Sequence, residues 1–244
     1  MKNQKKSSQN NPLVSIVTVV LNGEKHLEKT IQSVINQTYK NIEYIIIDGG
    51  STDRTLDIVK SYKDKIDYWL SEPDNGIYDG MNKGLDHAAG GWIYFLGSDD
   101  VLYDNEIISD VITFLDENTS LVFGNIIYND RKIVKSRFNM LTLLHNTVHH
   151  QSAFYNAKLF SNWRYDSGIR LIADYELNLK IYIERMKYRY IDKNISICNQ
   201  SGQSRENLAL AFAETNIIRN KYIRGAAGGI LSLLYFIKFR ISHG

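Results

Sequence analysis

The chain has 244 residues, of which 43% are hydrophobic, and its formal net charge at pH 7 is only +2. This length suits one sizeable α/β domain, alone or with an appendage, and the small net charge gives no reason to expect a nucleic-acid partner. Cys198 is the single cysteine, so an intramolecular disulfide is excluded, which is compatible with a reducing, cytoplasmic location. Residues 1–11 are polar and lack an apolar core, so they are expected to form a disordered tail and not a secretory signal.

Apolar runs that are typical of buried strands alternate with segments of helical spacing in the first half of the chain. The expected strands are 13–20, 42–47, 66–70, 92–96 and 121–128. The expected helices are 27–35, 78–89, 107–115 and one that Ser51 or Thr52 caps and that carries Leu56, Val59 and Tyr62. The strand 42–47 is apolar throughout, as is typical of a parallel strand that is buried on both faces. The alternation predicts a doubly wound, mostly parallel α/β sheet of Rossmann-like type.

Polar residues follow three of these strands, at the sheet edge where open α/β sheets bind their ligands. They occupy residues 19–22, 48–51 and 98–100, and the last group is Ser98-Asp99-Asp100. Adjacent carboxylates at such an edge suit a hard divalent cation, which in turn suits a diphosphate, although an isolated Asp-Asp pair is more often a solvated turn. Neither a G-x-G-x-x-G nor a G-x-x-x-x-G-K-[ST] motif is present, which argues against a dinucleotide dehydrogenase and a P-loop enzyme.

Several segments of the chain resemble, in order and in spacing, the family 2 glycosyltransferases of the GT-A fold. They are VSIVT at 14–18 with Asn22, SVINQTY at 33–39, IDGGSTD at 47–53, EPDNGIYD at 72–79, MNKG at 81–84 and GSDD at 97–100. A weaker likeness continues to about residue 205 through HHQS at 149–152 and ADYEL at 173–177. The resemblance implies a nucleotide-sugar-binding part over 12–130 and an acceptor and catalytic-base part of the same domain over 131–215.

The resemblance also implies which residues bind the donor nucleotide sugar, whose nucleotide is UDP in most such enzymes. The donor-binding residues that it implies are Val19, Asn22, Asp48, Asp79, Asn82, Lys83 and Asp99. Val19 would lie against the base, and Asp48 would accept a hydrogen bond from it, because a carboxylate can only accept. Lys83 would pair with a phosphate. The alternatives are a plain turn residue for Asp48 and an ordinary exposed helix face for residues 79–83.

Asp99 and Asp100 occupy the last two positions of the metal motif of the family, which is usually written D-x-D. Ser98 stands at the first position, where an acid is common. The resemblance implies Mg²⁺ or Mn²⁺ bound directly by Asp100, with Asp99 on the donor ribose or on a water of the metal. Such a cation would neutralise the charge that develops on the departing nucleoside diphosphate.

Asp174 corresponds to the carboxylate that acts as the general base in inverting members of the family. This base removes the proton of the acceptor hydroxyl as its oxygen attacks the anomeric carbon. Glu176 and Asp166 are the alternative bases, and a simple acid of a helix N-terminus is the plain interpretation of Asp174. His150, by the same resemblance, lines the acceptor side.

The last part of the chain, 216–244, is expected to form an amphipathic helix. Residues 225–237 carry no charge, and the basic residues that flank them are Arg219, Lys221, Arg224, Lys238 and Arg240. Thirteen helical residues span about 20 Å, which is short of the roughly 30 Å hydrocarbon core of a bilayer. The helix is therefore expected to lie on an anionic membrane surface, or to dock on the domain or on a partner chain.

The sequence thus predicts a metal-dependent, inverting transferase that moves one sugar from a nucleotide-diphosphate sugar to a saccharide or a polyprenyl-linked saccharide. Surface-polysaccharide synthesis at the inner face of a bacterial membrane is the setting that the resemblance implies. The Q-x-x-R-W element of processive members is absent from the sequence. Two alternatives are a nucleotidyltransferase that makes a nucleotide sugar, which lacks here the glycine- and basic-rich loop it needs, and a non-catalytic nucleotide-sugar-binding module.

Overall fold

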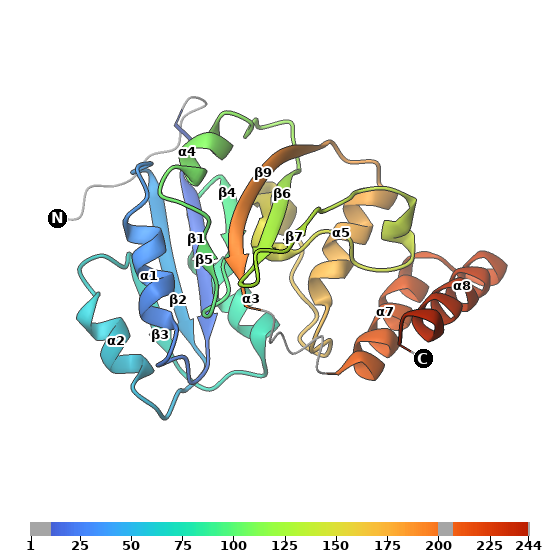
Figure 1. Cartoon of the computed structure of the whole chain (residues 1–244), viewed down its shortest axis with the longest axis horizontal. Helices are drawn as coiled ribbons and strands as arrows, with labels where there is room; N and C mark the ends of the chain where they lie inside the picture. The colour runs from blue at the N-terminus through green and yellow to red at the C-terminus, as the bar shows by residue number, and fades with distance from the viewer. Residues whose placement is uncertain (1–10, 200–206, 244) are drawn as a thin grey trace.

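Strands from most of the chain join in one mixed sheet, as the computed structural model shows for residues 11–199 and 207–243 (Figure 1). The strands are β1 (Val14–Val20), β2 (Ile42–Asp48), β3 (Tyr68–Ser71), β4 (Trp92–Phe95), β5 (Val101–Leu102), β6 (Leu121–Tyr128), β7 (Ile133–Val134), β8 (Ala153–Asn156) and β9 (Tyr188–Cys198). Their order is β3-β2-β1-β4-β8-β6-β9-β5, with β7 paired to β6. Strands β3, β2, β1 and β4 are mutually parallel. The expected tail falls outside the described residues, apart from Asn11.

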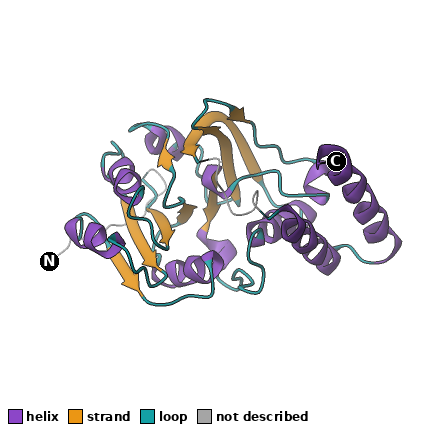
Figure 2. Ribbon diagram, turned by 60° about the horizontal axis from the view of Figure 1, so that its bottom comes forward, coloured by secondary structure: helices purple, strands orange, loops and turns teal. Residues whose placement is uncertain are grey.

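Helices cover both faces of this sheet (Figures 1 and 2). They are α1 (Leu27–Ile35), α2 (Thr55–Ser61), α3 (Ile77–His87), α4 (Ile107–Ile112), α5 (Ala173–Ile183), α7 (Leu208–Tyr222) and α8 (Gly225–His243), with short 3₁₀ turns η1 (Met140–Leu143), η2 (His150–Ser152) and η3 (Ala157–Phe160). Alternate strand residues point to opposite faces. Ile16 and Tyr44 pack with α1, α2 and α4, whereas Val17 and Ile45 pack with α3 and α5. The predicted α/β sheet, mostly parallel and covered on both faces, is confirmed.

The structure differs from the simple alternation of strand and helix in its second half. β8 lies between β4 and β6 and is antiparallel to both, so β6 does not lie next to β4. β9 runs parallel to β6 and carries mostly exposed residues in its first half. The helix expected after Ser51 or Thr52 begins only at Thr55. The expectation of a cap there was wrong, because Ser51 bonds to Asp48 at the end of β2 and to Asn22 in the loop after β1, and Thr52 also bonds to Asn22.

Helix α3 lies unusually close to β1, because two glycines face the strand. A Cβ atom at Gly80 would stand 2.4 Å from Cγ1 of Val19, and one at Gly84 would stand 2.4 Å from Cγ1 of Val17. No side chain fits at either position without a shift of its neighbours. The close contact brings the first turn of α3 to the carboxyl edge of the parallel strands.

Helices α7 and α8 lie together at one end of the molecule (Figures 1 and 2), and α7 crosses the expected division between 215 and 216. The buried Arg219 of α7 donates to the carbonyl of Leu144 at 3.0 Å and to Oγ of Ser232 on α8 at 2.9 Å. The buried Glu214 accepts from the backbone amides of Arg170 and Leu171 at 2.7 and 2.9 Å. Helix α8 exposes a row of apolar side chains, namely Ile230, Leu233, Leu234, Phe236 and Ile237. In the described ranges, no helix has both the length and the apolar character that crossing a bilayer requires.

Candidate functional site

Asp48 ends β2 and is 1% exposed, because the loop that follows folds back around its carboxylate. The carboxylate accepts from the backbone amides of Gly50 and Ser51 at 3.2 and 3.1 Å, from Oγ of Ser51, and from Oγ of Ser71 at 2.7 Å. Gly50 has φ = 87°, a conformation that a residue with a side chain rarely adopts. Asp48 therefore organises this turn, and its contact with a nucleotide base stays a prediction.

Asn22 joins the loop after β1 to the loop after β2. Its backbone amide donates to Oγ of Ser51 at 2.7 Å, and its side-chain oxygen accepts from the amide of Thr52 at 2.9 Å. The residue has φ = 53°, which asparagine tolerates better than most residues. The two polar clusters expected at these strand ends thus form one connected rim, with Val19 packed just below it against Gly80.

Two of the expected donor-binding residues of α3, Asn82 and Lys83, are already engaged by neighbouring groups. Asn82 exchanges hydrogen bonds with the backbone of Tyr165, at 2.8 Å as donor and 2.9 Å as acceptor. Nζ of Lys83 lies 2.9 Å from Glu72 and 3.8 Å from Asp79. Burial lowers the pKa of Lys83, but these two acids more than offset burial and raise the pKa above its ordinary value. Asn82 therefore joins α3 to the segment before α5, and Lys83 closes the loop at the N-terminus of its own helix.

The expected cation site contains one buried and one exposed carboxylate. Asp100 is 2% exposed, and its Oδ1 accepts from the amide of Asn199 at 3.0 Å, whereas its Oδ2 is buried without a hydrogen bond to any described residue. Burial and the neighbouring Asp99 raise the pKa of Asp100 to about 6. Thr30 of α1 fixes this turn by donating to the carbonyl of Asp100 at 2.7 Å, a contact that the sequence did not reveal.

These groups fit a divalent cation, because an unpaired buried carboxylate oxygen next to a second carboxylate is the kind of donor set that Mg²⁺ and Mn²⁺ bind. Across residues 11–199 and 207–243, no group of three or more His, Cys, Asp or Glu side chains forms a metal cluster. Asp99 and Asp100 would therefore be the protein ligands, and water and substrate oxygens would complete the coordination, as is usual for Mg²⁺.

Asp174 lies in the first turn of α5 and is 5% exposed. Its Oδ1 lies 3.1 Å from the hydroxyl of Tyr78, and its Oδ2 lies 2.8 Å from Nδ2 of Asn146 and 3.4 Å from Nδ1 of His150. Burial alone would raise the pKa of Asp174, but His150 and Tyr78 more than offset burial and hold this pKa below its ordinary value. The carboxylate is thus kept as an anion at neutral pH. Asn146 and Tyr78 were not among the predicted site residues.

The two alternative bases, Asp166 and Glu176, form ion pairs and hydrogen bonds with side chains of α7. Asp166 and Glu176 lie 2.9 and 3.3 Å from Nζ of Lys221, and Glu176 also accepts from the hydroxyl of Tyr222 at 3.1 Å. Both acids therefore hold α7 against the segment around α5. Asp174 is the candidate whose carboxylate instead faces His150.

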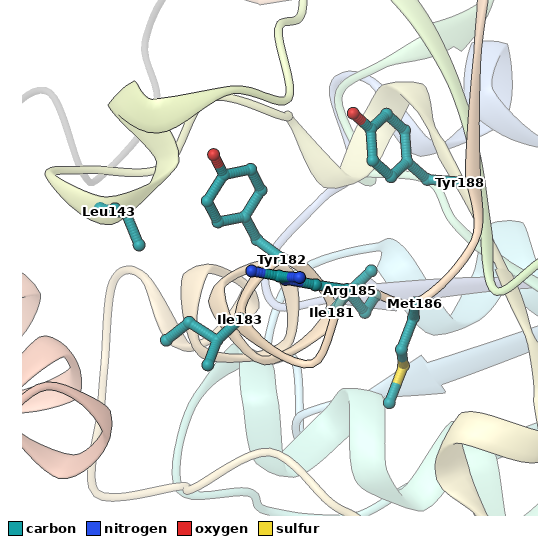
Figure 3. A pocket seen from close by; sticks show the side chains of 7 residues that line it. All are labelled: Leu143, Ile181, Tyr182, Ile183, Arg185, Met186 and Tyr188. Atoms are coloured by element: carbon teal, nitrogen blue, oxygen red, sulfur yellow. The ribbon is translucent and has the colours of Figure 1, made fainter.

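A cavity of about 500 Å³ lies at the far end of α5, away from these groups (Figure 3). Its lining residues are Leu143, Ile181, Tyr182, Ile183, Arg185, Met186 and Tyr188. Asp174 is in the first turn of α5, so about 14 Å of helix separates it from Ile183. β9 begins at this cavity and ends beside Asp100. The cavity is therefore not part of the candidate site.

Residues 15–206 match the family model described as Glycosyl transferase family 2. A PGL/p-HBAD biosynthesis glycosyltransferase of Mycobacterium bovis (strain BCG / Pasteur 1173P2) is 32% identical over 200 residues, which cover 78% of each chain. A glycosyltransferase of Rickettsia conorii (strain ATCC VR-613 / Malish 7) is 29% identical over 232 residues, which cover 86% of this chain and 38% of that protein.

Two solved structures share the fold. S. aureus TarS 1–349 in complex with UDP has a TM-score of 0.69 at 20% identity and covers 91% of this chain and 70% of its own. The mannosyltransferase PcManGT of Pyrobaculum calidifontis, in complex with GDP-Man and Mn²⁺, has a TM-score of 0.70 at 14% identity and covers 98% of this chain and 73% of its own. The fold is therefore the GT-A type that the sequence predicted.

Proposed function

Because the chain belongs to glycosyl transferase family 2, we propose that it moves one sugar at a time, with inversion, from a UDP-sugar to a hydroxyl of a saccharide acceptor. The observation that carries this proposal is the position of His150. It contacts Asp174 at 3.4 Å and also acts electrostatically on Asp100. The proposed base and the proposed diphosphate side thus share one neighbourhood. The nucleotidyltransferase and the non-catalytic module are set aside, since the chain is a glycosyltransferase.

The proposed transfer is a single displacement. Asp174 accepts the proton of the acceptor hydroxyl, the hydroxyl oxygen forms a bond to the anomeric carbon, and the bond from that carbon to the diphosphate oxygen breaks. Among the described residues, Tyr78 is the hydrogen-bond partner of Oδ1 of Asp174. The hydroxyl of Tyr78 has one hydrogen, which it donates either to Oδ1 or to the carbonyl of Leu171 at 3.0 Å. Oδ1 is therefore the oxygen with room for the proton. Mg²⁺ or Mn²⁺ held by Asp99 and Asp100 would supply charge neutralisation for the diphosphate.

UDP is proposed as the donor nucleotide because the TarS structure contains UDP. The rim formed by Val19, Asn22 and Asp48 would bind its base, and Lys83 of α3 would face the phosphates. GDP remains the competing nucleotide, since PcManGT contains GDP-Man. A binding screen that compares UDP-sugars with GDP-sugars is therefore the first test of this proposal.

A polyprenyl-linked saccharide at the inner face of the membrane is proposed as the acceptor. The support is the C-terminal helix α8, which exposes an apolar row at Ile230, Leu233, Leu234, Phe236 and Ile237. Arg224, just before α8, is exposed, and Lys238 and Arg240 follow the apolar row in the sequence. Exposed apolar area flanked by positive charge is what an anionic bilayer surface binds.

The test is a donor screen followed by one substitution. UDP-, GDP- and dTDP-sugars are titrated into the full chain with Mn²⁺ and with EDTA, and transfer is then measured with the donor that binds. Asp174→Asn should abolish transfer while donor affinity is retained. If no donor binds, the proposed use of a nucleotide sugar is overturned. If turnover survives Asp174→Asn, the assignment of Asp174 as the base is overturned.

A further inference from the structure

A row of polar side chains extends from Asp174 into the core of the protein. Nδ2 of Asn146 lies 2.8 Å from Oδ2 of Asp174, Nδ2 of Asn178 lies 3.0 Å from Oδ1 of Asn146, and the hydroxyl of Tyr155 lies 3.0 Å from Oδ1 of Asn178. Tyr155 and Asn178 are completely buried, and Asn146 is half-buried. Asn178 stands one helical turn after Asp174 on α5, and Tyr155 belongs to the central strand β8, so rigid elements hold both ends of the row.

The direction of every hydrogen bond in this row is fixed by groups that can only accept. Nδ2 of Asn178 also lies 3.2 Å from the carbonyl of Val148, so the amide nitrogen of Asn178 must point that way and its oxygen must face Tyr155. Asn146 then receives a hydrogen bond on its oxygen and turns its nitrogen to the Asp174 carboxylate. All three donors therefore point toward the same negative charge.

We propose that Tyr155, Asn178 and Asn146 are positioning residues, which together orient the Asp174 carboxylate and stabilise its negative charge. The proposal rests on the proposed role of Asp174 as the base. Aligned hydrogen bonds polarise one another, so the outer donors strengthen the bond that Asn146 makes to the carboxylate. With Asn146 and His150 on Oδ2, the carboxylate is held so that Oδ1 receives the proton.

Other titratable groups also face Asp174, and the row leaves them in place. Tyr78 approaches from α3, and His149 and His150 approach from the segment at η2. Tyr165 belongs to the segment before α5, and burial, Tyr155 and Asp174 raise its pKa. Tyr78 and His150 contact the Asp174 carboxylate directly, whereas the hydroxyl of Tyr155 contacts Asn178. A change at Tyr155 therefore reports on the row.

The chain itself offers a matched control for removing the hydroxyl of Tyr155. Tyr165 is also buried, it also lies near Asp174, and its hydroxyl makes no hydrogen bond to any described residue. Tyr155→Phe and Tyr165→Phe each delete one buried oxygen, but only the first removes a donor from the row. Asn146→Ala removes the last link directly, at a half-buried position where folding is least at risk.

The experiment follows the ionisation of Asp174 itself in the metal-free, donor-free full chain. The ¹³C shifts of the carboxyl carbons of labelled aspartates are recorded against pH, and the Asp174 signal is identified by its loss in Asp174→Asn. Asn146→Ala should raise the pKa of Asp174 by about one unit, the equivalent of one hydrogen bond to a charged group. Tyr155→Phe should raise it by about half a unit through the weakened row, and Tyr165→Phe should leave it unchanged.

An unfolded fraction would titrate near the ordinary aspartate value and would also raise the apparent midpoint, so the titration is read only over the pH range in which circular dichroism shows each variant to be folded. Tyr165→Phe controls for a loss of stability. Unchanged titration in Asn146→Ala and Tyr155→Phe, or an equal shift in Tyr155→Phe and Tyr165→Phe, overturns the proposal. Failure of the proposed function is separately visible. If Asp174→Asn still transfers sugar, the base assignment fails, whatever the titration of the carboxyl shows.

Discussion

The close contact of α3 with β1 leads to a prediction about Gly80→Ala. This substitution should destabilise the wild type but stabilise a variant in which Val19 has been replaced by alanine. The Cβ atom of Gly80→Ala would stand 2.4 Å from Cγ1 of Val19, about 1 Å short of ordinary contact. Val19 is β-branched and sits on a strand, so it cannot rotate away freely. Overpacking of this kind destabilises by about 1–3 kcal/mol, and replacing a helical glycine by alanine returns about 1 kcal/mol. Gly80→Ala should therefore lower the free energy of unfolding by about 1 kcal/mol.

Removing the two methyl groups that obstruct the new Cβ changes this balance. In a Val19→Ala background the closest remaining atom is Oδ2 of Asp74 at 3.3 Å, so the helical gain of about 1 kcal/mol should dominate. Gly80→Ala is thus expected to destabilise the wild type and to stabilise the Val19→Ala variant. Val17→Ala is the matched control, because Val17 meets Gly84 and does not obstruct Gly80.

Urea unfolding of the four proteins of this double-mutant cycle measures the coupling energy. A coupling near 2 kcal/mol is expected for Gly80 with Val19, since the clash is present in Gly80→Ala and is absent once Val19 is also replaced by alanine. A coupling near zero is expected for Gly80 with Val17. If both cycles are additive, α3 does not lie on β1 at the distance described, and the position of the first turn of α3 in the site falls with it.

Three further outcomes follow from the acids and from the last helix. Asp100→Asn should weaken Mn²⁺ binding at least tenfold by calorimetry, and Asp99→Asn should weaken it less, because the buried Oδ2 of Asp100 has no hydrogen-bond partner among the described residues. Equal affinity in all three proteins would count against this site. Lys221 holds the pKa of Asp166 below its ordinary value, so the stability from this pair is present above about pH 4 and is lost as the pH falls through the lowered pKa. Lys221→Met should accordingly lower the melting temperature at pH 7 and reduce its drop on acidification, and an unchanged drop would contradict the ion pair. Leu233→Glu should decrease co-sedimentation with anionic phospholipid vesicles and leave donor binding intact, and undiminished sedimentation would argue against α8 as the membrane contact.

The parallel half of the sheet could be predicted from the sequence because both of its faces are covered. Residues such as Ile16 and Ile45 pack on opposite helical layers, so the strands read as continuous apolar runs. β8 and β9 gave no such signal. β8 has only the four residues Ala153–Asn156, which is too short for a periodic pattern. β9 lies next to the last strand of the sheet, and most residues of its first half are exposed, so it shows no long apolar pattern.

The candidate site divides in the same way. Asp99 and Asp100 could be singled out from their place after a strand, whereas the roles expected of Asp48 and Asp174 came from the family resemblance. The partners of Asp174 could not be proposed, because Asn146 and Tyr155 are distant along the chain and are ordinary polar residues by type. The start of α2 was missed for a related reason, since the hydroxyl of Ser51 is used by Asp48 and not by the helix.

The family match ends at residue 206, but the contacts around Asp174 do not. Glu214 accepts hydrogen bonds from the backbone amides of Arg170 and Leu171, just before α5. Arg219 donates to the carbonyl of Leu144, two residues before Asn146. Two of the chain segments next to the proposed base are therefore held by α7, which lies beyond the matched region. A protein trimmed to residue 206 would keep every predicted donor-binding residue and lose these contacts of Glu214 and Arg219. The support of Asp174 therefore extends beyond the region that the family model matches.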